Sequence, residues 1–228
     1  MAKNKKETTE PSVEALENAL TRTEQYIENN QKSLTIIVLA IIVIVGLFIG
    51  YKRLYIAPME KDAQAEIFAA EQYFEKDSFN LALNGDGNYL GFLGIIDNYG
   101  PSRTGNLAYY YAGICYRNLG EYETAIDYLK RYSIKDEMLG SITYGAIGDC
   151  YVQLNNLEEG VSNYMEAANY EKNDFSTPVF LMKAGLVYEK LGKMDKALEV
   201  YKQIKKDFPK SSEAREVEKH IARVETSL

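Results

Sequence analysis

The stretch GICYRNLGEYETAIDYL, residues 113–129, decides the fold, because its pattern returns twice further along the chain. It contains a glycine, a tyrosine three residues later, a Leu-Gly pair and then a small residue. The recurring glycines are Gly113, Gly148 and Gly185, at spacings of 35 and 37 residues. Self-similarity at such a period indicates a solenoid of stacked helical units.

The other positions of the pattern recur with the same chemistry. Tyrosine follows each glycine at Tyr116, Tyr151 and Tyr188. Residues that tolerate a left-handed turn come next, at Gly120, Asn155 and Gly192. Small residues then return at Ala125, Gly160 and Ala197. We therefore expect each unit to be two antiparallel helices joined by a tight turn, with small residues where the backbones approach.

At these positions the sequence resembles the tetratricopeptide repeat, whose pattern of aromatic, Leu-Gly, Tyr, small and Pro positions runs over about 34 residues. The residues that carry the resemblance are Tyr109, Gly113, Tyr116, Ala125 and Leu129; Tyr144, Gly148, Tyr151, Gly160, Tyr164 and Ala167; and Gly185, Tyr188, Ala197, Tyr201, Ile204 and Pro209. The departures are Gly160 in place of alanine, a first unit without the terminal proline, and two extra residues within 171–178.

The predicted fold class is all-α, with a single N-terminal transmembrane helix followed by a solenoid of about four helix pairs and a C-terminal capping helix. Residues 89–102 echo residues 200–212, with Phe92 matching Tyr201, which predicts a degenerate first unit. Its first helix is expected from Met59 to Glu75, with Phe68 and Tyr73 facing inward. The predicted boundaries are a tail over 1–32, the membrane segment over 33–52, the degenerate unit over 59–104, repeats over about 106–139, 141–175 and 178–210, and the capping helix over 211–226.

The segment from Leu34 to Ile49 predicts the membrane helix. It has 13 Leu, Ile, Val or Phe residues out of 16 and no charge. With its neighbours it reaches a length of about 28 Å at 1.5 Å per residue, close to the hydrocarbon thickness of a bilayer. We expect an uncleaved signal anchor rather than a cleaved signal peptide, because the run starts late and lacks a cleavage motif. Gly46 and Gly50 form a G-x-x-x-G that would let another membrane helix pack closely, unless their spacing is chance.

The apolar spacing of residues 13–27 within the tail predicts a short amphipathic helix. We expect the tail to be cytoplasmic and the large domain periplasmic, in a bacterial inner membrane, as is common for a single anchor of this layout. The Lys and Arg residues beside the span lean slightly toward the opposite orientation.

Composition limits the chemistry. The formal charge is -7 and no basic face is apparent, which argues against nucleic acid as a partner. With one histidine, two cysteines and no G-x-S-x-G, P-loop or H-E-x-x-H motif, we expect no enzyme, no metal, no cofactor and no small-molecule substrate.

Three smaller features have competing interpretations. Cys115 and Cys150 are expected to be buried free thiols rather than a redox pair, because equivalent helices lie too far apart for a disulfide. His220 is expected at the surface or in an interface rather than on a metal. The segment NGDGN, residues 84–88, is expected to be a glycine-rich turn rather than a calcium loop, because the place of the bidentate glutamate holds Ile95.

The resemblance to the tetratricopeptide repeat also implies a groove lined by fixed positions of the first helix of each unit. Carried over, these positions are Leu107, Tyr110, Ile114, Arg117 and Asn118; Ile142, Asp149, Val152 and Gln153; and Val179, Met182, Leu186, Glu189 and Lys190. The set is largely apolar with mixed charges, as on a surface that takes hydrophobic or amphipathic segments. The alternative is that the C-terminal helix or residues 171–178 cover part of it.

In layout the chain resembles the YfgM family of ancillary subunits of the bacterial SecYEG translocon. That resemblance implies binding rather than catalysis: the anchor would sit beside the translocon subunits, and the domain would hold a periplasmic chaperone or an emerging secretory chain. The alternatives are a scaffold in envelope assembly or cell division without a chaperone role, and an import receptor facing the cytosol.

Overall fold

The structure is a computed structural model that describes residue 25, residues 27–134 and residues 136–228. The chain divides into two compact units, Met1–Tyr55 and Ile56–Leu228. The amphipathic helix expected over 13–27 lies almost entirely outside the described residues.

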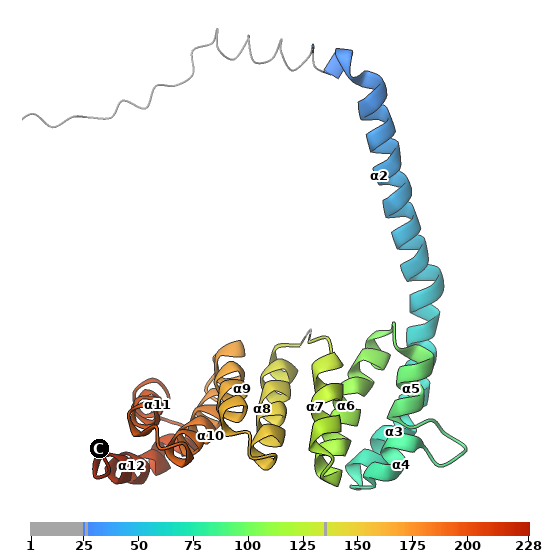
Figure 1. Cartoon of the computed structure of the whole chain (residues 1–228). Helices are drawn as coiled ribbons and strands as arrows, with labels where there is room; N and C mark the ends of the chain where they lie inside the picture. The colour runs from blue at the N-terminus through green and yellow to red at the C-terminus, as the bar shows by residue number, and fades with distance from the viewer. Residues whose placement is uncertain (1–24, 26, 135) are drawn as a thin grey trace, which may run out of the picture. The chain divides into compact units, whose positions relative to one another are not determined.

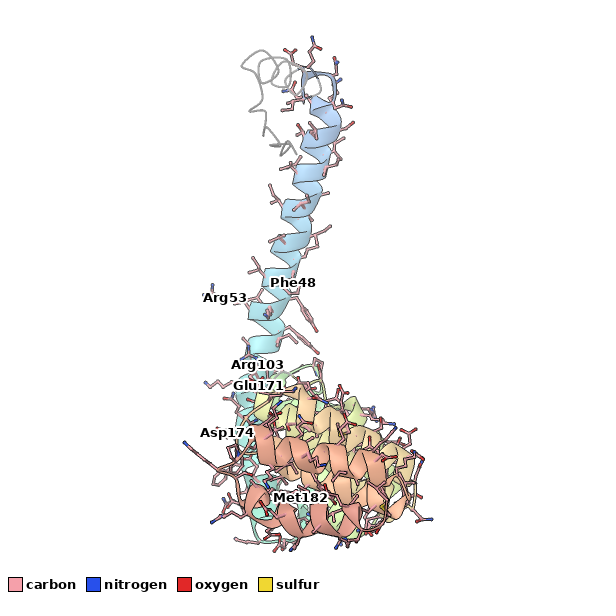
Figure 2. The ribbon with its side chains drawn as sticks, turned by 90° about the vertical axis from the view of Figure 1, so that its left-hand side faces the viewer. Phe48, Arg53, Arg103, Glu171, Asp174 and Met182 are labelled. Carbon is pink, nitrogen blue, oxygen red and sulfur yellow. The ribbon has the colours of Figure 1, made fainter. Side chains whose placement is uncertain are left out.

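In the first unit, helix α2 (Gln31–Tyr51) contains the apolar segment. None of its residues is buried, and its side chains, Phe48 among them, project outward all along the helix (Figure 2). The one hydroxyl between Leu34 and Ile49 is satisfied within the helix, since Thr35 Oγ1 donates to the carbonyl of Gln31 at 2.8 Å. By length and composition, the helical stretch that starts at Gln31 can cross a membrane.

In its described part the second unit consists of helices and their connections, with one isolated bridge between Gly85 and Leu90 and no strand. A short π-helix (Lys52–Ile56) lies at the division of the chain. The α-helices that follow are α3 (Ala57–Glu75), α4 (Phe79–Asn84), α5 (Phe92–Tyr99), α6 (Arg103–Leu119), α7 (Tyr122–Arg131), α8 (Glu137–Gln153), α9 (Leu157–Tyr170), α10 (Thr177–Lys190), α11 (Met194–Asp207) and α12 (Ser212–Glu225).

These helices follow one another in a row, so that neighbours in sequence are neighbours in space (Figure 1). The pairs α6–α7, α8–α9 and α10–α11 are the three repeats, and α12 packs on α11 and α10 at the C-terminal end. The predicted all-α fold class is confirmed for the described residues.

The recurring glycine makes room for the side chain that lies sixteen residues later in the same repeat. A Cβ atom at Gly113 would lie 2.6 Å from Cγ of Leu129, and one at Gly148 would lie 2.7 Å from the ring of Tyr164. At Gly185 the Cβ atom would collide with the ring of Tyr201. The glycine therefore lets the second helix of each repeat place a large side chain against the backbone of the first.

The turns inside the repeats have the predicted left-handed residues. Gly120, Asn155 and Gly192 have φ angles of 83°, 58° and 69°. After each of them the backbone N–H of the next residue donates to a carbonyl five residues earlier, as for Glu121 on Tyr116 at 2.9 Å. This closes the helix end in the manner of a Schellman motif.

The degenerate unit has a long first helix, α3, but its second helix is split into α4 and α5. Phe92 and Ile95 of α5 are fully buried, as are their predicted counterparts Tyr201 and Ile204. Glu60 of α3 joins this unit to the first repeat, accepting from Thr104 N at 3.0 Å and Thr104 Oγ1 at 2.9 Å at the start of α6.

The inward orientation predicted for Phe68 is wrong. Its side chain is 64% exposed, whereas Ile67 and Ala70 of the same helix are buried. Small and branched residues at Ala63, Ile67 and Ala70 have the helical spacing of one face, and that face packs on the core. Tyr73 does pack against the core cluster, and its hydroxyl reaches Asp86.

Both cysteines are buried and free, as predicted. Burial raises the pKa of Cys115 to about 12 and that of Cys150 to about 11. Their thiols are therefore protonated at neutral pH and act as small core side chains.

We predict that Gly148→Ala destabilises the domain by about 1–3 kcal/mol, because the added methyl group must displace the ring of Tyr164. Denaturation of the full chain in detergent, followed by circular dichroism, measures this. Gly50→Ala is a matched control, since a Cβ atom there meets no described atom within 4 Å.

A double-mutant cycle identifies the cause. In a Tyr164→Ala background, Gly148→Ala should cost much less than in the parent protein. Equal costs in the two backgrounds would show that the glycine is not there for the tyrosine.

Candidate protein-binding groove

The fourteen residues predicted to face a partner all lie on helices α6, α8 and α10. Four of them, Val152, Leu186, Glu189 and Lys190, line one groove of about 400 Å³. The rest of its lining is Tyr164, Lys183, Val187 and Arg223. Because these residues come from α8, α9, α10 and α12, we call it the α8–α10–α12 groove.

Asp149 joins the first helices of all three repeats. Its Oδ1 accepts from Lys183 Nζ of α10 at 2.7 Å, and its Oδ2 lies 3.5 Å from Arg117 Nη1 of α6. Tyr164 of α9 donates its hydroxyl to the same Oδ1 at 2.7 Å. One carboxylate of α8 is therefore held by side chains from three other helices.

Glu189 has the corresponding role at the next junction. Arg223 of α12 donates to it twice, from Nε at 2.9 Å and from Nη2 at 2.7 Å. Tyr201 donates its hydroxyl to Glu189 Oε1 at 2.6 Å. Bidentate bonds between guanidinium and carboxylate groups are among the stronger polar contacts in proteins, so this contact fastens α12 to α10.

Tyr164 and Tyr201 thus occupy equivalent positions in their repeats and make equivalent contacts. Each lies against the recurring glycine of its repeat, and each hydroxyl bonds a carboxylate of the first helix. Burial and the neighbouring carboxylate raise the pKa of both hydroxyls, so they remain donors. In the first repeat Leu129 replaces the tyrosine and offers no hydroxyl.

His220 lies in an interface, one of the two places predicted for it. Its ring is 5.3 Å from that of Tyr201, and its Nδ1 is 2.7 Å from Arg223 Nη2. Because the guanidinium can only donate, Nδ1 accepts, and the imidazole is neutral. Burial and Arg223 lower the pKa of His220, although Glu189 opposes this.

The predicted residues differ in how accessible they are. Leu186 is 38% exposed, and Asn118, Gln153 and Lys190 are also exposed. Most of the others are half-buried. Ile114 must be removed from the set, because it is 6% exposed and packs in the core with Ala146 and Ile147 of the next repeat.

The sequence analysis missed Lys183, Arg223 and the hydroxyl of Tyr164. A signal existed for Tyr164, since its spacing from Gly148 repeats at Tyr201 and Gly185. Lys183 lies two residues before Gly185, outside the family positions. Arg223 reaches the groove only because of how α12 packs, which no local pattern reveals.

The residues of two other predicted features are not among those that line this groove. Gly46 and Gly50 lie on α2, with no described atom within 4 Å of a Cβ atom built on either. Asp86 closes the glycine-rich turn, accepting from the backbone N–H groups of Asn88 and Tyr89 at 2.9 Å each.

The comparisons with known proteins match the repeats. Sequence patterns described as tetratricopeptide repeat match residues 107–133, 142–174 and 180–211. No curated protein matches the chain. The chain is similar to a solved structure titled "Crystal structure of MamA protein", with 16% identity over 71% of this chain and 76% of that one and a TM-score of 0.49. A second MamA structure has 19% identity over 60% of this chain and 90% of that one, with a TM-score of 0.40.

We predict that acid weakens the contact between α10 and α12. Burial tends to raise the pKa of Glu189, but the hydrogen bonds from Arg223 and Tyr201 outweigh it and leave the pKa lowered. A carboxyl whose pKa is lower in the folded state stabilises the fold above its unfolded pKa, and this stabilisation is lost as the pH falls through the folded pKa. The loss should therefore occur below about pH 4.5.

Glu189→Gln should lower the free energy of unfolding at pH 7 by about 1–3 kcal/mol and flatten its decline below about pH 4.5. Denaturation at a series of pH values measures both. Glu218→Gln is the control, because its ion pair with Lys205 is exposed and should matter little. A pH profile of Glu189→Gln that matches the parent would contradict the assignment.

Proposed function

Because the chain carries tetratricopeptide repeats, which bind proteins, we propose that the α8–α10–α12 groove holds a segment of a partner protein. The observation that carries the proposal is the apolar side of this groove, where Leu186 stays 38% exposed beside Val152 and Val187. An apolar strip on a helix face between charged side chains is a common way to recognise an amphipathic segment.

The other groove residues of the family pattern extend this surface in our proposal, Ile114 excepted. They are Leu107, Tyr110, Arg117, Asn118, Ile142, Asp149, Gln153, Val179 and Met182. Met182 is labelled in Figure 2, which views the domain from its C-terminal end.

We further propose that α2 crosses a bacterial inner membrane, with the repeats in the periplasm, and that the protein is an ancillary subunit of the Sec translocon. In that role the repeats hold a periplasmic chaperone or an emerging secretory chain. The support is the apolar helix α2, none of whose residues is buried, and the resemblance in layout to the YfgM family. Gly46 and Gly50 are the proposed contact between α2 and a membrane helix of the translocon.

Leu186→Asp tests the groove. The charge should reduce recovery of co-purified partners from detergent-solubilised membranes about tenfold, because a carboxylate would replace the apolar contact. Phe175→Asp is the matched control, since Phe175 is 83% exposed and lies outside the groove. Thermal unfolding of each variant shows that the fold is intact, and unchanged recovery with Leu186→Asp would overturn the groove.

The partners recovered distinguish the candidate functions. Translocon subunits recovered with both the parent and Leu186→Asp, together with a periplasmic chaperone or secretory chain that is lost only from Leu186→Asp samples, support the Sec assignment. A division or outer-membrane assembly protein in their place would support the scaffold instead.

Fusion of a phosphatase that is active only outside the cytoplasm tests the orientation. A fusion after Leu228 should be active, and the same phosphatase fused before Met1 of the full chain, on the other side of the span, should be inactive. The reverse pattern would place the repeats in the cytosol.

A further inference from the structure

We propose that the segment bound in the α8–α10–α12 groove is acidic and amphipathic, with carboxylates beside apolar residues. This inference rests on the proposed function of the groove and specifies the chemistry of its partner. The evidence is the balance of basic and acidic side chains in the groove and how deeply each of them is buried.

The groove has an excess of positive charge on a domain that is negative. Its charged lining is Lys183, Lys190, Arg223 and Glu189. Adding Asp149, which pairs with Lys183, and Arg117, which pairs with Asp149, gives four basic groups and two acidic ones. Residues 54–228 as a whole have 19 basic and 27 acidic residues. The groove is therefore locally positive, although the domain as a whole carries more acidic than basic residues.

Glu189 and Asp149 lie deeper than Arg223 and Lys183, whereas the side chain of Arg117 is as exposed as that of Asp149, at 29%. The side chain of Glu189 is 15% exposed, and that of its partner Arg223 is 53% exposed. The side chain of Asp149 is 29% exposed, and that of Lys183 is 38% exposed. A ligand that enters the groove therefore meets Arg223 and Lys183 before it meets the two carboxylates.

The tyrosines explain this order of depth. The rings of Tyr164 and Tyr201 pack against the recurring glycines of their repeats. Their hydroxyls donate hydrogen bonds to Asp149 and Glu189, at 2.7 and 2.6 Å. Each carboxylate is thereby fixed on its inner side by a group that brings no positive charge. The cations above them keep donors that can turn toward a second carboxylate, since Lys and Arg have three and five N–H donors.

Lys190 is the cation best placed to meet a ligand. It is exposed, it lines the groove beside Leu186, and within the described part of the chain it has no carboxylate in ion-pair contact. Complementary charge of this kind orients a bound segment and selects between partners.

Binding of two labelled peptides tests the proposal. The acidic probe has leucines at helical spacing and glutamates between them, and the basic probe has lysines in place of the glutamates. The full chain is used in nanodiscs of zwitterionic lipid, with empty nanodiscs as the blank. Fluorescence anisotropy should show the acidic probe binding at least about tenfold more tightly, and the preference should shrink as salt is added.

Charge reversal at one position identifies the site. Lys190→Glu should weaken binding of the acidic probe about three- to tenfold. Lys206→Glu makes the same change in net charge on the exposed side of α11 and should leave binding unchanged. Three outcomes would overturn the acidic preference. They are a basic probe that binds as tightly as the acidic one or more tightly, equal effects of the two variants, and binding of neither probe.

Leu186→Asp separates this inference from the proposed function. If it abolishes binding of both probes while they bind the parent equally, the groove binds proteins but has no acidic preference. If both probes bind Leu186→Asp as tightly as they bind the parent, the groove assignment fails as well.

Discussion

The contact between a glycine of one helix and the side chain sixteen residues later is the constraint on which the rest of the domain depends. At Gly113, Gly148 and Gly185 any larger residue would force the side chain opposite to shift, because a Cβ atom there would overlap it. This close approach sets the spacing within each pair, and the left-handed turn residues Gly120, Asn155 and Gly192 then close the pair. Equivalent pairs stack because each leaves an apolar face for the next, so one local contact, repeated, produces the row of helices.

The same contact also shapes the groove. A tyrosine that passes the glycine reaches the first helix of its repeat, and its hydroxyl there bonds Asp149 or Glu189. Those carboxylates in turn bond Lys183 and Arg223, which join one repeat to the next and α12 to the last repeat. The polar contacts that hold the stack together are therefore the ones that leave cations at the surface, so stability and ligand preference arise from the same side chains.

The sequence alone predicts the parts of this structure that local spacing controls: the recurring glycines, the turns, the buried cysteines and the equivalence of Phe92 with Tyr201. It fails where tertiary packing decides. Phe68 points outward because Ile67 and Ala70 take the core face of α3. Ile114 occupies a groove position of the family but is buried in one core cluster with Ala146 and Ile147 of the next repeat. Arg223 enters the groove from a helix whose sequence shows only an amphipathic pattern. Side chains that reach between helices require the packing itself to be known.

Site-specific photo-crosslinking in intact membranes tests the central claim, that the α8–α10–α12 groove binds a partner, most directly. A photoreactive amino acid at position 186 probes the groove, and the same amino acid at position 175 probes an exposed site outside it. We predict one discrete crosslinked product from position 186, and we expect the acidic probe to suppress it by competition. Position 175 should give no such product. Crosslinks that are the same from both positions, or none from position 186 while position 175 gives a discrete product, would contradict it.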